Sequence, residues 1–90
     1  MVRIGSAADL GAYIRSQRNG ADLSQSELAR RAGVSRRWLV SLEQGKPTAA
    51  FDLVLRTLDA LGAVLDARRD VHRGADLDEL IRRHTDEPRD

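Results

Sequence analysis

The strongest constraint on this chain of 90 residues is the stretch 24–46, where two short helical patterns lie only a few residues apart. Ser24 is followed three residues later by Glu27, the spacing of a capping box, in which each side chain accepts the backbone N–H of the other residue. Apolar residues then recur at helical spacing as far as Gly33. Because glycine adopts positive φ without strain, Gly33 is the expected end of this first helix.

The second helix of the pair is expected to begin after Ser35, which is a good N-cap residue. Its buried side would be formed by Leu39 and Leu42, and the pair Gln44-Gly45 followed by Pro47 should end it. Two short helices joined by a tight turn that contains glycine form the plan of a DNA-binding helix-turn-helix.

In that arrangement the first residues of the second helix enter the major groove of DNA. The outward residues are then Ser35, Arg36 and Arg37, followed one turn later by Val40 and Ser41. Arginine pairs bidentately with the O6/N7 edge of guanine, so we expect one of the two consecutive arginines to read a base and the other to bind phosphate. Taken singly, each of these side chains could equally be ordinary solvated surface.

Five further residues are candidates for contacts with the DNA backbone. Gln25 lies in the first turn of its helix, where a polar side chain and the helix N-terminus can together bind phosphate. Arg31, Lys46 and Thr48 are weaker phosphate candidates. Trp38 lies beside the buried face of its helix, so we expect it to be partly buried with its indole N–H directed at the DNA backbone; packing alone is the alternative.

An ion pair between Arg18 and Glu43 is expected inside the domain. Residues 7–19 form a helical pattern after Ser6, and Arg18 continues the apolar stripe of Leu10 and Ile14, so it should point at the core. A buried arginine needs a carboxylate partner, and Glu43 at the end of the second helix of the pair is the candidate. An exposed Arg18 whose alkyl stem covers the core is the alternative.

A fourth helix is predicted over residues 49–61, followed by a short strand over residues 63–68. Apolar residues recur at helical spacing in the helix, and we expect the set Phe51, Val54, Leu55, Leu58 and Leu61 to face the core. The strand segment then alternates: Ala63, Leu65 and Ala67 on one side, Val64, Asp66 and Arg68 on the other. A lone strand leaves backbone groups unpaired, so we expect it to pair with its copy in a second chain. A frayed continuation of the fourth helix is the alternative.

Composition and charge exclude several other classes of protein. No apolar run approaches a membrane span, and the absence of cysteine makes a cytoplasmic protein the default. Residues 1–48 carry eight Arg or Lys against four acidic residues, whereas residues 49–90 carry seven against ten, so the basic half suits a polyanion. His72 and His84 lack the spacing of metal ligands, and the serines serve as helix caps. We therefore expect no enzyme, no metal and no cofactor.

The chain divides into two parts. Residues 1–69 are expected to form one DNA-binding and dimerisation domain. Residues 70–90 are expected to contain a linker, a short amphipathic helix over residues 76–84 and a flexible tail.

The motifs of residues 24–48 resemble the Xre/Cro-type helix-turn-helix regulators, and the match extends over about residues 6–68. The motifs are Ser24-Gln25-Ser26-Glu27-Leu28-Ala29, Gly33-Val34-Ser35 and Leu42-Glu43-Gln44-Gly45-Lys46-Pro47-Thr48. The Gly-Lys-Pro-Thr turn and the strand segment further resemble HipB-type antitoxins. The resemblance implies an all-α, four- to five-helix lambda-repressor-like domain with a short C-terminal dimerisation strand.

The resemblance also implies function and partners. It implies a homodimeric repressor that binds a double-stranded DNA operator, controls its own operon and binds a HipA-like serine/threonine kinase toxin. Gln25 matches a phosphate-contacting position of the family, and Arg36, Arg37 and Ser41 match base-reading positions. The Arg18–Glu43 pair matches a family ion pair. Two alternatives remain: an adaptor that mainly neutralises the toxin, and a solitary regulator without one.

Overall fold

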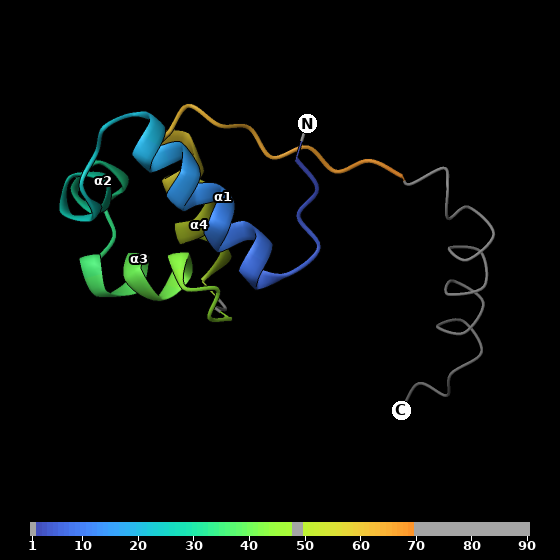
Figure 1. Ribbon diagram of the computed structural model, residues 1–90, viewed down its shortest axis with the longest axis horizontal. Coiled ribbons are helices and arrows are strands. Elements are labelled where there is room, and N and C mark those ends of the chain that lie inside the picture. The colour runs from blue at the N-terminus through green and yellow to red at the C-terminus, as the bar shows by residue number, and fades with distance from the viewer. Residues whose placement is uncertain (1, 48–49, 70–90) are drawn as a thin grey trace.

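The computed structural model describes residues 2–47 and 50–69, and these residues form four α-helices (Figure 1). The helices are α1 (Ala7–Gly20), α2 (Gln25–Ala32), α3 (Arg36–Glu43) and α4 (Phe51–Ala60). This confirms the predicted all-α class with a helix-turn-helix at residues 24–46. The expected start of the fourth helix at Ala49, and the helix expected over residues 76–84, lie outside the described residues.

Serine side chains begin the first three helices, as the sequence predicted. The hydroxyl of Ser6 accepts the backbone N–H of Asp9 at 3.1 Å, and Ser35 caps α3. At α2 the capping box is complete: Ser24 Oγ accepts the N–H of Glu27, and Glu27 Oε1 accepts the N–H of Ser24, both at 3.0 Å. These bonds satisfy N–H groups that have no partner inside the helix.

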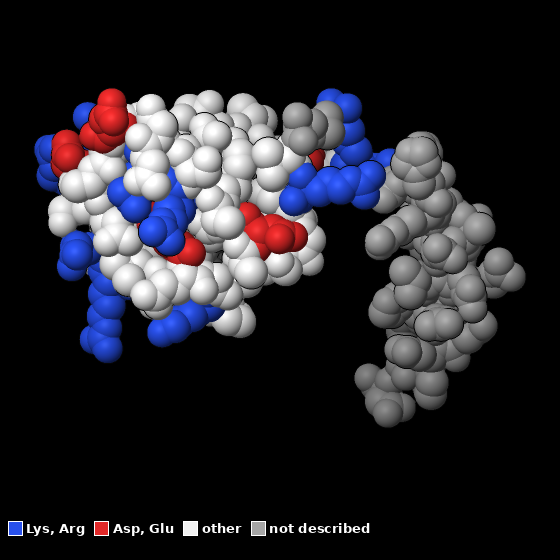
Figure 2. Space-filling view, viewed as in Figure 1, with Lys and Arg blue, Asp and Glu red and all other residues white. Residues whose placement is uncertain are grey.

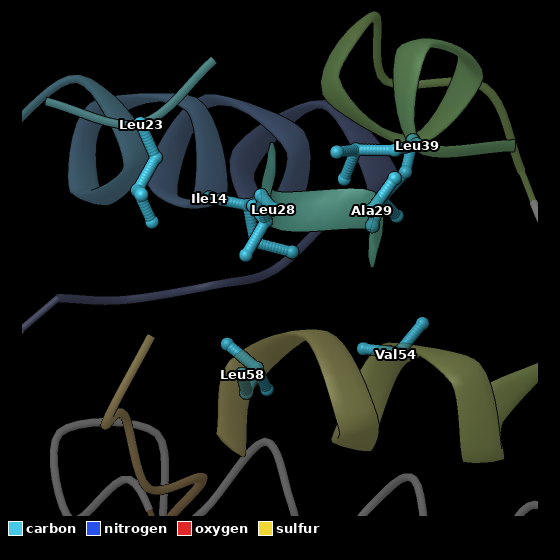
Figure 3. Close-up of a cluster of buried hydrophobic side chains, with 8 residues drawn as sticks. Ile14, Leu23, Leu28, Ala29, Leu39, Val54 and Leu58 are labelled. Atoms are coloured by element: carbon cyan, nitrogen blue, oxygen red, sulfur yellow. The ribbon is translucent and has the colours of Figure 1, made fainter. Parts of the chain in front are cut away.

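The core is small and aliphatic, and all four helices contribute to it (Figure 3). Helix α2 packs against both α3 and α4, and α1 packs against α3. The buried hydrophobic cluster consists of Ile14, Leu23, Leu28, Ala29, Leu39, Leu42, Val54 and Leu58. Because this cluster holds one side of α3 inside the domain, the opposite side of α3 faces outward.

Two glycines allow α1 and α3 to approach closely. A Cβ on Gly11 would overlap the carbonyl oxygen of Leu42 and lie 2.9 Å from that of Glu43. A Cβ on Gly45, which follows the C-cap of α3 with φ of 79°, would lie 2.8 Å from the Cα of Ala8. The apolar pattern of the sequence predicted no role for Gly11, although a glycine inside a helical pattern is a signal of close packing.

The predicted core face of α4 is partly wrong. Val54 and Leu58 are buried as expected, but Phe51 is 58% exposed and Leu55 is 44% exposed. The face that packs inward passes through Thr57 instead, which is fully buried and donates its hydroxyl to a backbone carbonyl one turn earlier. The small core covers only that side of α4, and Phe51 and Leu55 lie on the neighbouring flank.

The strand predicted over residues 63–68 is not formed in the single chain, since residues 63–69 have neither helical nor strand structure. A strand is defined by backbone hydrogen bonds to a neighbouring strand, and the described residues contain no strand with which this segment could pair. The alternative of a continued α4 is also wrong, because the helix ends at Ala60 and Gly62 turns the chain with φ of 70°.

None of the helices in the part of the chain that the structure covers, residues 2–47 and 50–69, is long and apolar enough to cross a membrane.

Replacing Gly11 with alanine should destabilise the domain. The new methyl group would push α3 away from α1, and forced overpacking of this kind costs about 1–3 kcal/mol. Thermal unfolding followed by circular dichroism should show a lower Tm, by about 4–8 °C per kcal/mol in a domain of this size. Gly20→Ala is the matched control: a Cβ there meets nothing within 4 Å, so its Tm should stay the same or rise. An equal Tm for Gly11→Ala and wild type would contradict the close approach.

The capping box at α2 should make stability depend on acid. The backbone hydrogen bond from Ser24, followed by the Ser24 side chain and the nearby Arg31 and Arg30, lowers the pKa of Glu27 below its ordinary 4.5. A carboxylate with a lowered pKa in the folded state contributes stability that is complete above the unfolded pKa and is lost as the pH falls through the folded one.

The test compares wild type with Glu27→Gln, which keeps a capping acceptor and cannot titrate. The difference between their Tm values should be smaller at about pH 3 than at about pH 6. A difference that is the same at both pH values would show that the charge of Glu27 does not contribute.

Candidate DNA-binding site

Helices α2 and α3 are joined by a tight turn of three residues. Gly33 adopts the left-handed conformation with φ of 72°, and the N–H of Val34 donates to the carbonyl of Ala29 at 3.0 Å. The Val34 side chain packs against the core. Ser35 then begins α3, and its hydroxyl accepts the N–H of Trp38 at 3.0 Å. The turn therefore fixes the angle at which α3 leaves α2.

The outward side of α3 carries the residues that the sequence predicted for base reading. Leu39 and Leu42 are buried, and Arg36 and Arg37 are exposed at the first turn. Figure 2 shows basic side chains extending outward from the N-terminal end of α3. One turn later, Val40 and Ser41 are half-buried. Arginine guanidinium groups at the start of an exposed helix can reach base edges and phosphates.

Trp38 is half-buried and packs against the hydrophobic core. This confirms the predicted partial burial of the ring. A contact of its indole N–H with the DNA backbone stays a prediction.

Arg18 and Glu43 form the predicted ion pair. Arg18 Nε donates to Glu43 Oε2 at 2.7 Å and Nη2 donates to Oε1 at 3.0 Å, while Nη1 donates to the carbonyl of Leu23 at 2.9 Å. The side chains of Arg18 and Glu43 are only 11% and 3% exposed. The hydrogen bond to Glu43 raises the pKa of Arg18 above its ordinary value, against the opposing effect of burial, so the arginine stays charged. The alternative of an exposed Arg18 is wrong.

Gln25 has a partner that the sequence analysis did not predict. Its Nε2 donates to Glu43 Oε1 at 3.2 Å, so the ion pair extends to the first residue of α2. The sequence placed Glu43 opposite Arg18 but held no signal that α2 would begin at the same point. The structure thus brings Gln25, Arg18 and Glu43 together, whereas Arg36 and Arg37 lie at the other end of α3.

Of the remaining candidates for phosphate contacts, two are exposed and one lies outside the described residues. Arg31 and Lys46 are exposed, and Thr48 lies outside the described residues. The acidic residues of α2 and α3 are Glu27, which is held in the capping box, and Glu43, which is paired with Arg18. The exposed cationic side chains of α2 and α3 therefore have few exposed acidic groups beside them on the same two helices.

Residues 2–47 and 50–69 hold no cluster of three or more His, Cys, Asp or Glu side chains that could bind a metal ion. His72 and His84, which the sequence analysis excluded as metal ligands, lie outside these residues.

Comparison with known proteins agrees with this arrangement. A family described as a helix-turn-helix domain matches residues 9–72. An uncharacterized HTH-type transcriptional regulator of Sinorhizobium fredii, y4mF, is 48% identical over 64 residues, which cover 71% of this chain and 84% of that protein. The crystal structure of the clp gene regulator ClgR from C. glutamicum is 34% identical and superposes with a TM-score of 0.61, covering 66% of this chain and 76% of that one. The chain therefore belongs to the helix-turn-helix domain family and is a DNA-binding, HTH-type transcriptional regulator rather than an enzyme.

Proposed function

We propose that this regulator is a sequence-specific repressor that binds a double-stranded operator as a homodimer in the cytoplasm. The observation that carries the proposal is the orientation of α3. Leu39 and Leu42 hold one side of the helix in the core, so Arg36 and Arg37 extend from the opposite side, where the major groove would lie.

The proposed contacts with DNA are of two kinds, contacts with bases and contacts with the DNA backbone. Arg36 and Arg37 supply the guanine contact and a phosphate contact, and Ser35 and Ser41 supply hydroxyl groups to the same groove. The residues assigned to the DNA backbone are Gln25, Trp38, Lys46 and Thr48. Base contacts determine which sequence is bound, and backbone contacts determine how the protein is placed on it.

The proposal of a homodimer is supported by the apolar surface that the single chain leaves exposed. Val64 and Leu65 are 90% and 47% exposed, in a segment of alternating residues that has no strand partner within residues 2–47 and 50–69. Pairing the segments Ala63–Arg68 of two copies would satisfy the backbone groups along one edge of each segment. Phe51 and Leu55 on the exposed flank of α4 are further apolar surface for a second copy to cover. A two-fold dimer would bind two half-sites about one helical turn, roughly 34–36 Å, apart.

The exposed flank of α4 also supports a second candidate. A HipB-like antitoxin would use such a surface to bind a HipA-like kinase, and the resemblance at Gly45-Lys46-Pro47-Thr48 is in keeping with it. A kinase-like open reading frame beside this gene favours the antitoxin or the toxin-neutralising adaptor. Its absence favours a solitary regulator.

Replacing Arg36 with alanine should remove discrimination at one base pair. We expect a loss of about 1–3 kcal/mol in binding the operator and a relaxed preference at a single position of each half-site. The measurement is a fluorescence-anisotropy titration against the operator and against a set of single-base variants of it. Arg37→Ala, measured in parallel, shows which of the two arginines reads the base.

Arg15→Ala is the matched control, because Arg15 is exposed on α1 and the substitution removes the same charge. It should leave the base preference unchanged. If Arg36→Ala and Arg37→Ala both kept full affinity and full base discrimination, α3 would not be the reading helix.

Replacing Leu65 with aspartate should shift the protein from dimer to monomer. The two copies of the segment would then place like charges together at the pairing edge, which is unfavourable. Sedimentation equilibrium of the full chain measures the effect, and Arg69→Gln, just beyond the segment, is the control. A wild-type chain that stays monomeric, or a Leu65→Asp chain that dimerises as wild type does, would contradict pairing through this segment.

A further inference from the structure

Three helices meet at the Glu43 carboxylate. Arg18 reaches it from the C-terminal half of α1, Gln25 from the first residue of α2, and Glu43 itself is the last residue of α3. Both carboxylate oxygens have partners: Oε2 accepts Arg18 Nε at 2.7 Å, and Oε1 accepts Arg18 Nη2 at 3.0 Å and Gln25 Nε2 at 3.2 Å.

The carboxylate determines which way the Gln25 amide is turned. The reverse orientation would place the amide oxygen of Gln25 against Oε1 of Glu43, with two acceptors in contact and no hydrogen between them. Nε2 therefore points inward, and one of its two hydrogens is used by Glu43. The second hydrogen of Nε2 has no acceptor among residues 2–47 and 50–69, and Gln25 is only half-buried.

Phosphate oxygens accept hydrogen bonds and do not donate them, so only an N–H of the Gln25 amide can bind phosphate. A freely rotating amide would lose side-chain entropy on binding, whereas an amide already held by Glu43 has lost it in the folded protein. Arg18 pairs with both oxygens of Glu43, which offsets the negative charge that would otherwise repel a nearby phosphate.

We propose that Glu43 is a positioning residue for DNA binding: through its hydrogen bond to Nε2 it holds the Gln25 amide with its second N–H ready to donate to a DNA phosphate, while Arg18 neutralises the carboxylate. The inference rests on the proposed function, in which Gln25 contacts the DNA backbone. It adds that the Arg18–Glu43 pair acts on DNA affinity through Gln25 as well as on the fold.

A double-mutant cycle tests this coupling. The affinities of wild type, Gln25→Ala, Glu43→Gln and the double variant are measured for operator DNA and for unrelated duplex DNA. Each variant is measured well below its Tm, with the folded fraction checked by circular dichroism. Gln25→Ala should weaken binding about tenfold for both duplexes alike, because a hydrogen bond to a charged group is lost. In the Gln25→Ala background, Glu43→Gln should change the affinity by no more than about twofold.

A second measurement does not depend on the stability of Glu43→Gln. The side-chain NH₂ group of Gln25 is followed by ¹⁵N relaxation in the wild-type protein without and with DNA. Gln17, exposed on α1, is the internal control. The Gln25 amide should already be ordered without DNA, and the chemical shifts of its hydrogens should move when duplex is added. Gln17→Ala is the matched control for affinity and should bind as wild type does.

The possible outcomes distinguish a failure of the positioning role of Glu43 from a failure of the proposed DNA-binding function. Additive effects of Gln25→Ala and Glu43→Gln, or a Gln25 amide as mobile as that of Gln17, would overturn the positioning role while leaving operator binding intact. A wild-type chain that binds no operator in preference to unrelated duplex, with an ordered Gln25 amide, would instead overturn the proposed function.

Discussion

The arrangement of the helices depends on the buried ion pair of Arg18 and Glu43. It ties the end of α1 to the end of α3, and a further bond from Arg18 to the carbonyl of Leu23 holds the segment that leads into α2. Removing either charge alone would leave the other buried without a partner, in a site where the carboxylate is 3% exposed. The loss of one partner of a buried ion pair lowers the free energy of unfolding by about 3–5 kcal/mol. The pair therefore restricts α3 to one position relative to α1, and the aliphatic core alone does not provide that directional restraint.

The sequence predicted the helix-turn-helix and the inward direction of Arg18 because those signals are local, and Glu43 followed as the carboxylate that a buried arginine needs. Arg18 continues an apolar stripe at a spacing of four residues, which determines its direction before any partner is known. Ser24, Glu27 and Gly33 likewise act within one turn of their own helix, and the capping box and the left-handed turn are both present. Patterns that act over one turn depend little on the rest of the chain.

Features that depend on contacts between distant segments were not predictable in this way. The apolar pattern of α4 is wider than the core it meets, and the packing of α4 against α2 and the shared core leaves Thr57 buried and Leu55 exposed. Gly11 is required because backbone atoms of α3 lie against it, and Gln25 meets Glu43 because two helix ends coincide in space. A glycine inside the α1 pattern indicates a close approach but not which element makes it, and the contact of Gln25 with Glu43 has no signal in the spacing of residues along the sequence.

The exposed apolar residues and the buried charges of this domain have a common explanation in its size. A single small core cannot cover every apolar residue, so Phe51, Leu55, Val64 and Leu65 remain on the surface. A regulator with one copy of α3 reads only a few base pairs, and joining two copies lengthens the site that is read. The apolar surface that the core cannot cover is thus available for contact with a second copy of the chain. Such a dimer would place two α3 helices at a fixed spacing only if each α3 is held rigidly in its own domain. The ion pair at Glu43 supplies that rigidity, because any rotation of α3 would break its hydrogen bonds to α1 and α2 together.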